Sequence, residues 1–270
     1  MKTVIEPASG RHARSRPLGI YLMAAGTVTL WGASFPLTKA ALGEAGPTAI
    51  AFLRWTVSAL VLLAWLGLAR RRGKSETVSD VIALIRSRWR TLWWVSLTGI
   101  TLFYFLENVA LRYTTATNAS ILTNLTPVFM VLIAAGLLRE KLSRSEWLAM
   151  LAAFVGSALV SQGAGHLTLT GTGLIGDVLM IVASFLGAVY SIGGKGLSER
   201  YPATVVITAV SALGALMLLP LALLEGLNLA LSFRAWLFII VLGVGSGAIA
   251  NLWWLSLLAR TPASRAALIL

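Results

Sequence analysis

The sequence contains no cysteine, and its two histidines, His12 and His166, lie outside the long apolar segments. The absence of cysteine excludes a disulfide framework, a thiolate metal site and a cysteine nucleophile. The apolar segments also lack an imidazole, which is the commonest metal ligand and general base in proteins. We therefore expect a protein that is not an enzyme, with no catalytic residues, no metal site and no cofactor.

Charged residues are also scarce, at 12% of the 270 residues, whereas 57% are hydrophobic and the mean hydropathy is +0.83. This composition excludes a soluble globular domain. Apolar runs of about 20 residues, the length that a helix needs to cross a bilayer, recur from end to end. We predict an all-α, polytopic membrane protein. The predicted spans are residues 18–40, 47–69, 91–112, 114–138, 144–162, 173–195, 202–225 and 234–258, and a further helix begins at Thr261 and is cut off at Leu270.

The net charge of +12 would suit a nucleic-acid-binding protein, but the basic residues gather in alternate loops. Most of the 22 Lys and Arg residues lie in the tail 1–17 and in the stretches 70–90, 139–146, 195–201 and 259–265. The positive-inside rule then places the N-terminal tail in the cytoplasm of a multi-pass protein of the inner or plasma membrane. The basic charge reflects topology, and we expect no nucleic-acid partner.

The segment 76–89 places Val78, Ile82, Ile85 and Trp89 at helical spacing, with Asp80 near its start. Such a pattern favours a short helix lying at the membrane interface. An ordered cytoplasmic connector is the alternative interpretation.

The span 114–138 carries an unusual stripe of polar residues followed by a proline near its centre. The stripe consists of Asn118, Ser120, Thr123, Asn124 and Thr126, and Pro127 follows it. Polar side chains and a helix-breaking proline at this depth are tolerated where they face a protein interior or a wet cavity. The stripe therefore predicts a cavity wall, with Pro127 as a hinge or kink.

The second half of the chain repeats the first. With an offset of 155 residues, Gly32, Ala33, Leu42, Glu44 and Pro47 align with Gly187, Ala188, Leu197, Glu199 and Pro202; with an offset of 147, Thr114, Ala116 and Ala119 align with Thr261, Ala263 and Ala266. Each copy should hold five helices, and an odd number puts the copies in opposite orientations. We predict two inverted repeats, 18–162 and 173–270, the second incomplete, so that about eight or nine of ten helices are present. Inverted repeats are typical of transporters, whose site lies at the repeat interface near the membrane midplane.

Several stretches resemble the EamA-type transporters of the drug/metabolite transporter superfamily. They are LWGASFPLTKAAL and PTAIAFLRW in the first two spans, and ALRYTTA, LTPVF and REKLSRSEWLAM further on. The resemblance implies ten helices with both termini in the cytoplasm. It also implies movement of small metabolites, including amino acids and amphipathic compounds, usually outward and without ATP.

Aromatic and amide side chains on the predicted inward faces are our candidates for contact with a substrate. Aromatic rings offer apolar area or cation–π contact, and amides can hold polar groups. Interhelical hydrogen bonds, close helix packing and an aromatic belt at the interface are the structural alternatives for the same residues. The candidates are Trp31, Tyr104, Asn108, Thr123, Asn124, Tyr190, Asn251 and Trp254.

Two charged residues fall inside predicted spans at matched depth. Arg54 lies about two turns inside the second span, and Glu107 lies about one and a half turns from the end of the third. We predict that they form an intramembrane charge pair, because pairing offsets the cost of holding either charge in the bilayer. Separate snorkelling, or a bond from each to a carbonyl, is the alternative.

These features together predict a monomeric secondary transporter that exports a small metabolite, an amino acid or an amphipathic compound, by alternating access. Its partners would be the lipid bilayer and the small-molecule substrate. Drug efflux, metabolite uptake and a non-transporting membrane scaffold or fragment are the alternatives.

Overall fold

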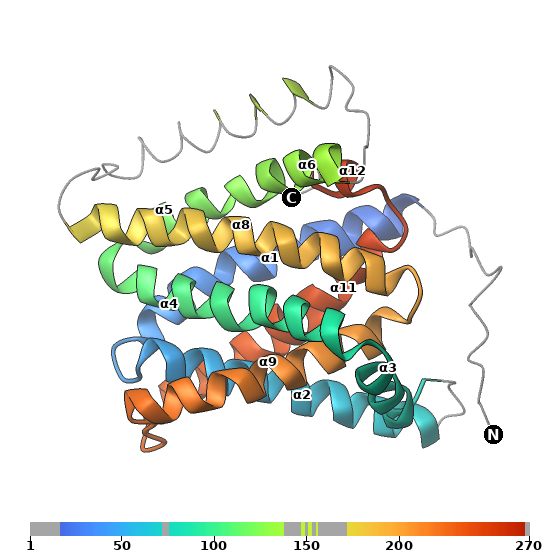
Figure 1. Cartoon of the computed structure of the whole chain (residues 1–270). Helices are drawn as coiled ribbons and strands as arrows, with labels where there is room; N and C mark the ends of the chain where they lie inside the picture. The colour runs from blue at the N-terminus through green and yellow to red at the C-terminus, as the bar shows by residue number, and fades with distance from the viewer. Residues whose placement is uncertain are drawn as a thin grey trace.

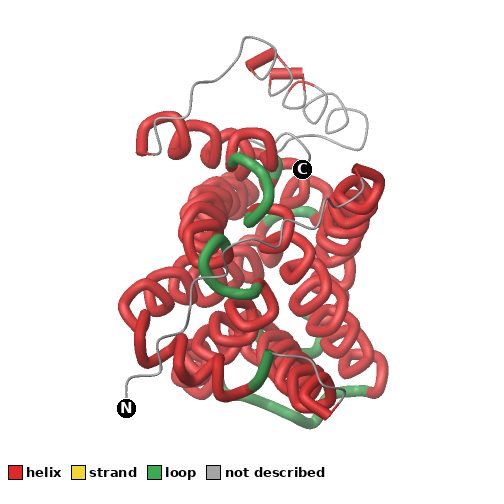
Figure 2. Tube along the Cα trace, turned by 90° about the vertical axis from the view of Figure 1, so that its right-hand side faces the viewer, coloured by secondary structure: helices red, strands yellow, loops and turns green. Residues whose placement is uncertain are grey.

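The computed structural model describes residues 17–71, 76–137 and 172–267, together with helical residues at 147, 148, 151, 152 and 155. Within these ranges every regular element is a helix and none is a strand (Figure 2). The first half contains α1 (Pro17–Ala41), α2 (Pro47–Arg71), α3 (Val78–Ser96), η1 (Leu97–Leu102), α4 (Phe103–Tyr113), α5 (Ala116–Thr123) and α6 (Leu125–Leu137). The second half contains α8 (Thr172–Ser198), α9 (Ala203–Glu225), α10 (Phe233–Val241), η2 (Leu242–Ile249), α11 (Ala250–Leu258) and α12 (Ala263–Ala267).

Seven helical stretches are long and apolar enough to cross a membrane, which confirms the all-α polytopic class. They match seven of the eight predicted spans, although the third begins earlier than predicted. The helix predicted from Thr261 begins at Ala263 as α12. Most of the predicted fifth span, 144–162, lies outside the described residues, as does the tail 1–17 except for Pro17.

The third helical stretch runs from Val78 to Tyr113 and includes most of the segment 76–89. Asp80 caps its start by accepting a hydrogen bond from the Thr77 backbone N–H at 2.7 Å. At Arg88 the backbone leaves the helical region, with φ −129° and ψ 28°, and the helix kinks there. The segment is thus a short helix, as predicted, and the kink at Arg88 sets it apart from the rest of the span. Val81 and Leu84 are buried in the core and hold it against the bundle.

A central antiparallel pair, α2 and α9, occupies the lower part of the view in Figure 1. Residues 205–211 of α9 are buried without interruption, which is typical of a helix surrounded by other helices. At one end of the pair, the Glu225 carboxylate accepts the backbone N–H groups of Thr48 and Ala49 at 2.9 and 3.0 Å. A carboxylate at a helix N-terminus satisfies bare N–H groups and complements the helix dipole.

The opposite end of the pair has a related contact. There the Thr204 hydroxyl, in the first turn of α9, donates a hydrogen bond to Glu76, which follows α2. Each helix of the pair is therefore tied at its start to a carboxylate at or just beyond the end of the other.

Helices α1 and α8 begin the two repeats and run in opposite directions (Figure 1). The end of α1 and the start of α8 both contact the end of α4. On the α8 side, the Thr114 hydroxyl donates a hydrogen bond to Asp177 Oδ1 at 2.8 Å. A lysine near the end of each first helix donates to two carbonyls at the end of that repeat's third span. These contacts join Lys39 to Leu111 and Thr114, and Lys195 to Leu258 and Thr261.

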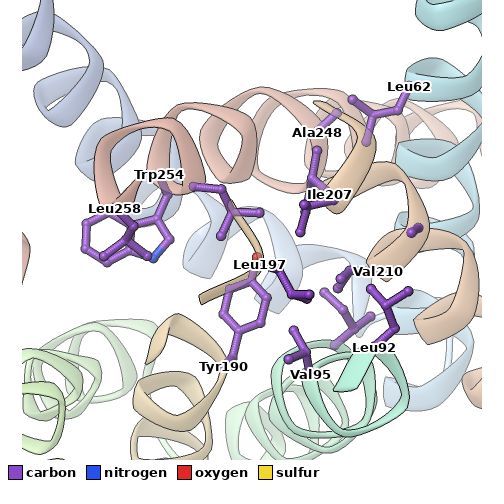
Figure 3. Close-up of a cluster of buried hydrophobic side chains, with 14 of the residues drawn as sticks. Leu62, Leu92, Val95, Tyr190, Leu197, Ile207, Val210, Ala248, Trp254 and Leu258 are labelled. Atoms are coloured by element: carbon purple, nitrogen blue, oxygen red, sulfur yellow. The ribbon is translucent and has the colours of Figure 1, made fainter. Parts of the chain in front are cut away.

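The main hydrophobic core lies where α3, α8, α9 and α11 converge. Figure 3 shows Leu92 and Val95 of α3 beside Val210 of α9, with Tyr190 of α8 and Trp254 of α11 across from them. The core thus packs the third spans of both repeats against the central pair and against α8. Tyr190 belongs to this core and also reaches the cavity described below.

Candidate functional site

A cavity of about 240 Å³ lies between the two repeats. Its walls come from α1, η1, α4 and the α5–α6 stretch of the first repeat, and from α8 and α11 of the second. Most of the residues predicted as a site line it: Trp31, Tyr104, Glu107, Thr123, Asn124, Pro127, Tyr190 and Asn251. A cavity of this kind, in which aromatic rings are combined with polar side chains, suits a small ligand.

The third span of each repeat contains a π-helical stretch beside the cavity, η1 in the first repeat and η2 in the second. A π-helical turn is wider than an α-helical one and is often found at functional sites. In η1, Gly99 lines the cavity in close contact with the Tyr190 ring, and a Cβ at this position would overlap that ring. Glycine at this position therefore allows Tyr190 to take its place in the wall.

In η2, the backbone carbonyl of Ser246 orients two lining side chains. It accepts hydrogen bonds from Trp31 Nε1 at 3.2 Å and from Asn251 Nδ2 at 2.8 Å. The Tyr190 hydroxyl then donates to Asn251 Oδ1 at 3.1 Å. An indole, an amide and a phenol from three helices are thereby locked in one network, which fixes the shape of the cavity.

The polar stripe of the fourth span forms a broken part of the helix, as its proline predicts. The helix α5 ends at Thr123, Asn124 takes a turn conformation with φ −65° and ψ −5°, and α6 begins at Leu125. Pro127 has no N–H to offer the Thr123 carbonyl four residues earlier, which weakens the helix at this point. The break lies in the cavity wall, where non-helical backbone at membrane depth is tolerated.

The structure brings the predicted partners Arg54 and Glu107 together in the bundle interior. Arg54 Nη1 lies 3.8 Å from Glu107 Oε1, and the two side chains are only 1% and 3% exposed. Arg54 Nη2 donates to Ser246 Oγ at 2.8 Å, and the guanidinium lies 4.4 Å from the centre of the Tyr104 ring. Arg54 thus links α2, α4 and η2, while Glu107 alone of the pair lines the cavity.

Two of the predicted contact residues lie outside the cavity lining. The Asn108 side-chain amide donates to the Pro47 carbonyl at 2.8 Å, so it joins α4 to the start of α2. Trp254 packs edge-on against Trp31, with ring centroids 5.8 Å apart, and its Nε1 donates to Ser191 Oγ at 3.2 Å. Because Trp31 and Ser191 both line the cavity, Trp254 supports its wall from behind.

Several lining residues were not among the sequence candidates, notably Phe35, Phe103, Gly99 and Gly187. Phe35 and Phe103 are apolar residues in apolar helices, so nothing in the sequence separates them from core or lipid-facing positions. The glycines carry a weak signal, because glycine in a helix interior marks a close approach of two chains. Ser246, which contacts Arg54, Trp31 and Asn251, lies in a run of small residues that also suits simple helix packing.

Among the described residues that line the cavity, only Glu107 is charged. Within the ranges that the structure describes, no group of three or more His, Cys, Asp or Glu residues is placed to hold a metal ion. The described lining can therefore offer aromatic faces, hydroxyls, amides and one carboxylate to a ligand.

Known proteins resemble this chain along most of its length. The EamA-like transporter family matches residues 18–162 and 174–270. An uncharacterized transporter of Archaeoglobus fulgidus is 35% identical over 219 residues, covering 79% of this chain and 70% of that protein. The uncharacterized transporter YetK of Bacillus subtilis is 27% identical, covering 92% of this chain and 74% of that protein.

A probable terminal-alkyne amino-acid exporter of Streptantibioticus cattleyicolor is 28% identical, over 72% of this chain and 61% of that protein. A solved crystal structure covers 94% of this chain and 83% of its own, with a TM-score of 0.75 and 22% identity, which supports the fold alone. The two matched segments together cover most of the chain, and the chain belongs to the EamA-like transporter family.

Proposed function

We propose that the protein is a secondary transporter that exports a small metabolite by alternating access. The observation that supports this most is the position of the cavity, which takes its walls from both repeats. In transporters built from inverted repeats, one repeat rocks against the other around a site at their interface. A cavity shared between the repeats would open to alternate sides of the membrane in such a movement.

The lining favours an amphipathic substrate such as an amino acid. Trp31, Phe103 and Tyr190 supply apolar area, and Thr123 and Asn251 supply hydrogen-bonding groups. The exporter relative from Streptantibioticus cattleyicolor, whose name specifies an amino acid, supports both the substrate class and the outward direction. Of the other predicted contacts, Tyr104 and Asn124 complete the proposed binding wall, whereas Asn108 and Trp254 would hold it in place.

The proposed orientation has a cytoplasmic N-terminus in the cell membrane. Arg86, Arg88 and Arg90 are exposed on α3, and the exposed Trp93 and Trp94 follow them. Basic residues beside an aromatic belt are typical of the cytoplasmic membrane interface. The end of the bundle at which α3 begins would therefore face the cytoplasm.

Flux into proteoliposomes tests the function. The purified protein is reconstituted, and radiolabelled amino acids, amphipathic amines and neutral metabolites are assayed one by one against protein-free liposomes. We expect saturable flux of at least one compound, and accelerated exchange when that compound is present on both sides. If no compound of a broad panel crosses faster than in protein-free liposomes, the transporter proposal fails and a non-transporting scaffold becomes the better explanation.

Direction is tested separately, with right-side-out and everted membrane vesicles from cells that produce the protein. Export predicts energised accumulation in everted vesicles. Accumulation only in right-side-out vesicles would favour uptake instead. Repeating the flux assay with and without an imposed pH gradient then shows whether proton movement is coupled to transport.

A further inference from the structure

The Glu107 carboxylate is an unusual lining group, because one of its oxygens is buried without a hydrogen bond. Among the residues that the structure describes, Oε1 has no hydrogen-bond partner, and the whole side chain is 3% exposed. Arg54 Nη1, which lies 3.8 Å from that oxygen, is likewise buried without a hydrogen bond within the described part of the chain, so the pair leaves hydrogen-bonding capacity unused, which is rare for buried polar groups. Because Glu107 lines the cavity, a ligand there can supply a hydrogen-bond donor to its carboxylate.

Arg54, the nearby arginine, does not donate a hydrogen bond to Glu107. The 3.8 Å between Arg54 Nη1 and Glu107 Oε1 exceeds a hydrogen-bond distance. The hydrogen bond that Arg54 makes goes instead to Ser246 Oγ, and its guanidinium lies over the Tyr104 ring. Arg54 lies outside the lining, so it offsets the charge of Glu107 from behind and leaves the carboxylate able to accept hydrogen bonds from the cavity side.

The rest of the wall favours a cation over an anion. Five aromatic residues line the cavity, and the faces of aromatic rings attract ammonium groups and repel carboxylates. These residues are Trp31, Phe35, Phe103, Tyr104 and Tyr190. Since Glu107 is the only charged residue in the part of the lining that the structure describes, a ligand carboxylate would meet a like charge, whereas a ligand ammonium would meet an opposite one.

We infer that the cavity recognises its substrate by a protonated amine, whose N–H groups donate to the Glu107 carboxylate. The inference rests on the proposed transport function and narrows its substrate class to small organic amines with an apolar body. A carboxylate on the substrate is not required. Amino acids belong to this class through their ammonium group, and simple alkylamines belong to it as well.

Calorimetric binding to the purified full chain in detergent tests the inference with three compounds of one shape. They are 3-methylbutylamine, the neutral 3-methyl-1-butanol and the anionic 4-methylpentanoate. We expect the amine to bind about tenfold or more tightly than either of the others, since a hydrogen bond to a charged group contributes more than a neutral one. In Glu107→Gln this preference should fall to about equal affinity.

Two further variants make the result specific. Glu107→Asp keeps the charge and should keep the preference for the amine. If Glu107→Gln does not fold, Glu107→Asp is the variant with which the role of the carboxylate is tested. Glu199→Gln makes the same chemical change on a carboxylate that is 47% exposed and outside the lining, and it should bind like the wild type. Size-exclusion profiles of all variants report whether they are folded.

The outcomes separate this inference from the transport function. Equal binding of amine and alcohol by the wild type overturns the inference, as does an amine preference that survives in Glu107→Gln. Failure of the wild type to bind the amine at all, while a compound that it transports does bind, also overturns it. In each case measured flux would leave the transporter proposal intact, whereas absence of flux for every compound rejects that proposal whatever the binding ratios.

Discussion

The first and second repeats share their lysine contacts and their π-helical third spans but differ in their buried charges. Lys39 and Lys195 bind equivalent carbonyls, and η1 and η2 lie at corresponding depths. The positions that correspond to Arg54 and Glu107 in the repeat register are occupied by Ala209 and Trp254.

This difference separates two kinds of feature. The lysine contacts and π-helical stretches, which fix the path of the helices, are duplicated. Both halves need the same helix arrangement if they are to move against each other. In the described parts of both repeats the buried charge pair occurs once, beside the cavity, where one ligand would be bound. The single pair therefore marks a specialised site within a symmetric frame, and the following changes test that distinction.

The largest effect is expected from removing one member of the charge pair. Arg54→Met leaves the Glu107 carboxylate buried without a counter-charge, which typically costs about 3–5 kcal/mol of folding free energy. The double variant Arg54→Met with Glu107→Gln removes both charges and should recover most of that loss. Thermal unfolding in detergent, followed by tryptophan fluorescence, measures both.

Ala209→Met at the corresponding site of the second repeat adds a side chain at a fully buried position and serves to compare the two halves. The stability lost in Ala209→Met should come from overpacking, and adding Glu107→Gln should not restore it. Equal instability of the single and double Arg54 variants would contradict the pairing.

A smaller effect is expected from adding one methyl group to a π-helical stretch. Gly99→Ala in η1 forces the Tyr190 ring to shift and should cost about 1–3 kcal/mol by overpacking. It should also weaken ligand binding, because Tyr190 and Asn251 share a hydrogen bond in the wall. Gly245→Ala in η2 is the matched control, since its new Cβ would meet Leu30 Cδ2 at an ordinary 3.4 Å.

Thermal unfolding and calorimetric binding distinguish these two glycines. If Gly245→Ala is as damaging as Gly99→Ala, then the π-helical geometry itself is intolerant of alanine. In that case the contact with Tyr190 would not be the cause.

The smallest effect is a pH dependence at the turn after α1. Glu44 accepts hydrogen bonds from the Ser232 hydroxyl and backbone N–H at 2.7 and 2.9 Å, and these contacts, with the charge of Arg234, lower the pKa of Glu44 below its ordinary value of 4.5. A carboxylate whose pKa is lower in the folded state stabilises that state above its unfolded pKa. This contribution is lost as the pH falls through the lowered folded value.

The pH dependence is measured as the unfolding midpoint of the wild type and Glu44→Gln from neutral pH to below 4.5. The wild type should be the more stable at neutral pH, and the two curves should converge in acid. Curves that stay parallel throughout would exclude a contribution from Glu44 ionisation. In the repeat register Glu199 corresponds to Glu44, but it contacts Lys195 at 2.7 Å instead of a neighbouring loop, so the two positions are expected to differ.

Much of this architecture could be predicted from sequence because the bilayer requires long apolar runs and the chain repeats itself. The third span shows the limit, since it was predicted to begin at residue 91. In the structure a helix begins at Val78 and kinks at Arg88, and residues 86–91 are all exposed. The pattern at 76–89 predicted a helix there but not that this helix joins the span through a kink.

The site was harder to predict than the fold. Aromatic and amide candidates were chosen by helical face, and most of them line the cavity. Asn108 was predicted to contact the substrate but lies outside the cavity lining. Its amide hydrogen-bonds the Pro47 carbonyl, and a partner so distant in sequence cannot be inferred from the helical face. The π-helical stretches depend on packing against other helices, and glycine-rich runs such as GVGSG suit an ordinary α-helix equally well.

The contacts at the ends of the central pair bear on how the chain is assembled during synthesis. The N–H groups that open α2 are capped by Glu225, which comes 177 residues after Thr48, so this end of α2 stays bare while the ribosome makes everything between. The start of α9 in turn uses Glu76 from the first half. The first half produced alone would lack the carboxylate that caps α2, and the second half would lack the Glu76 partner of Thr204.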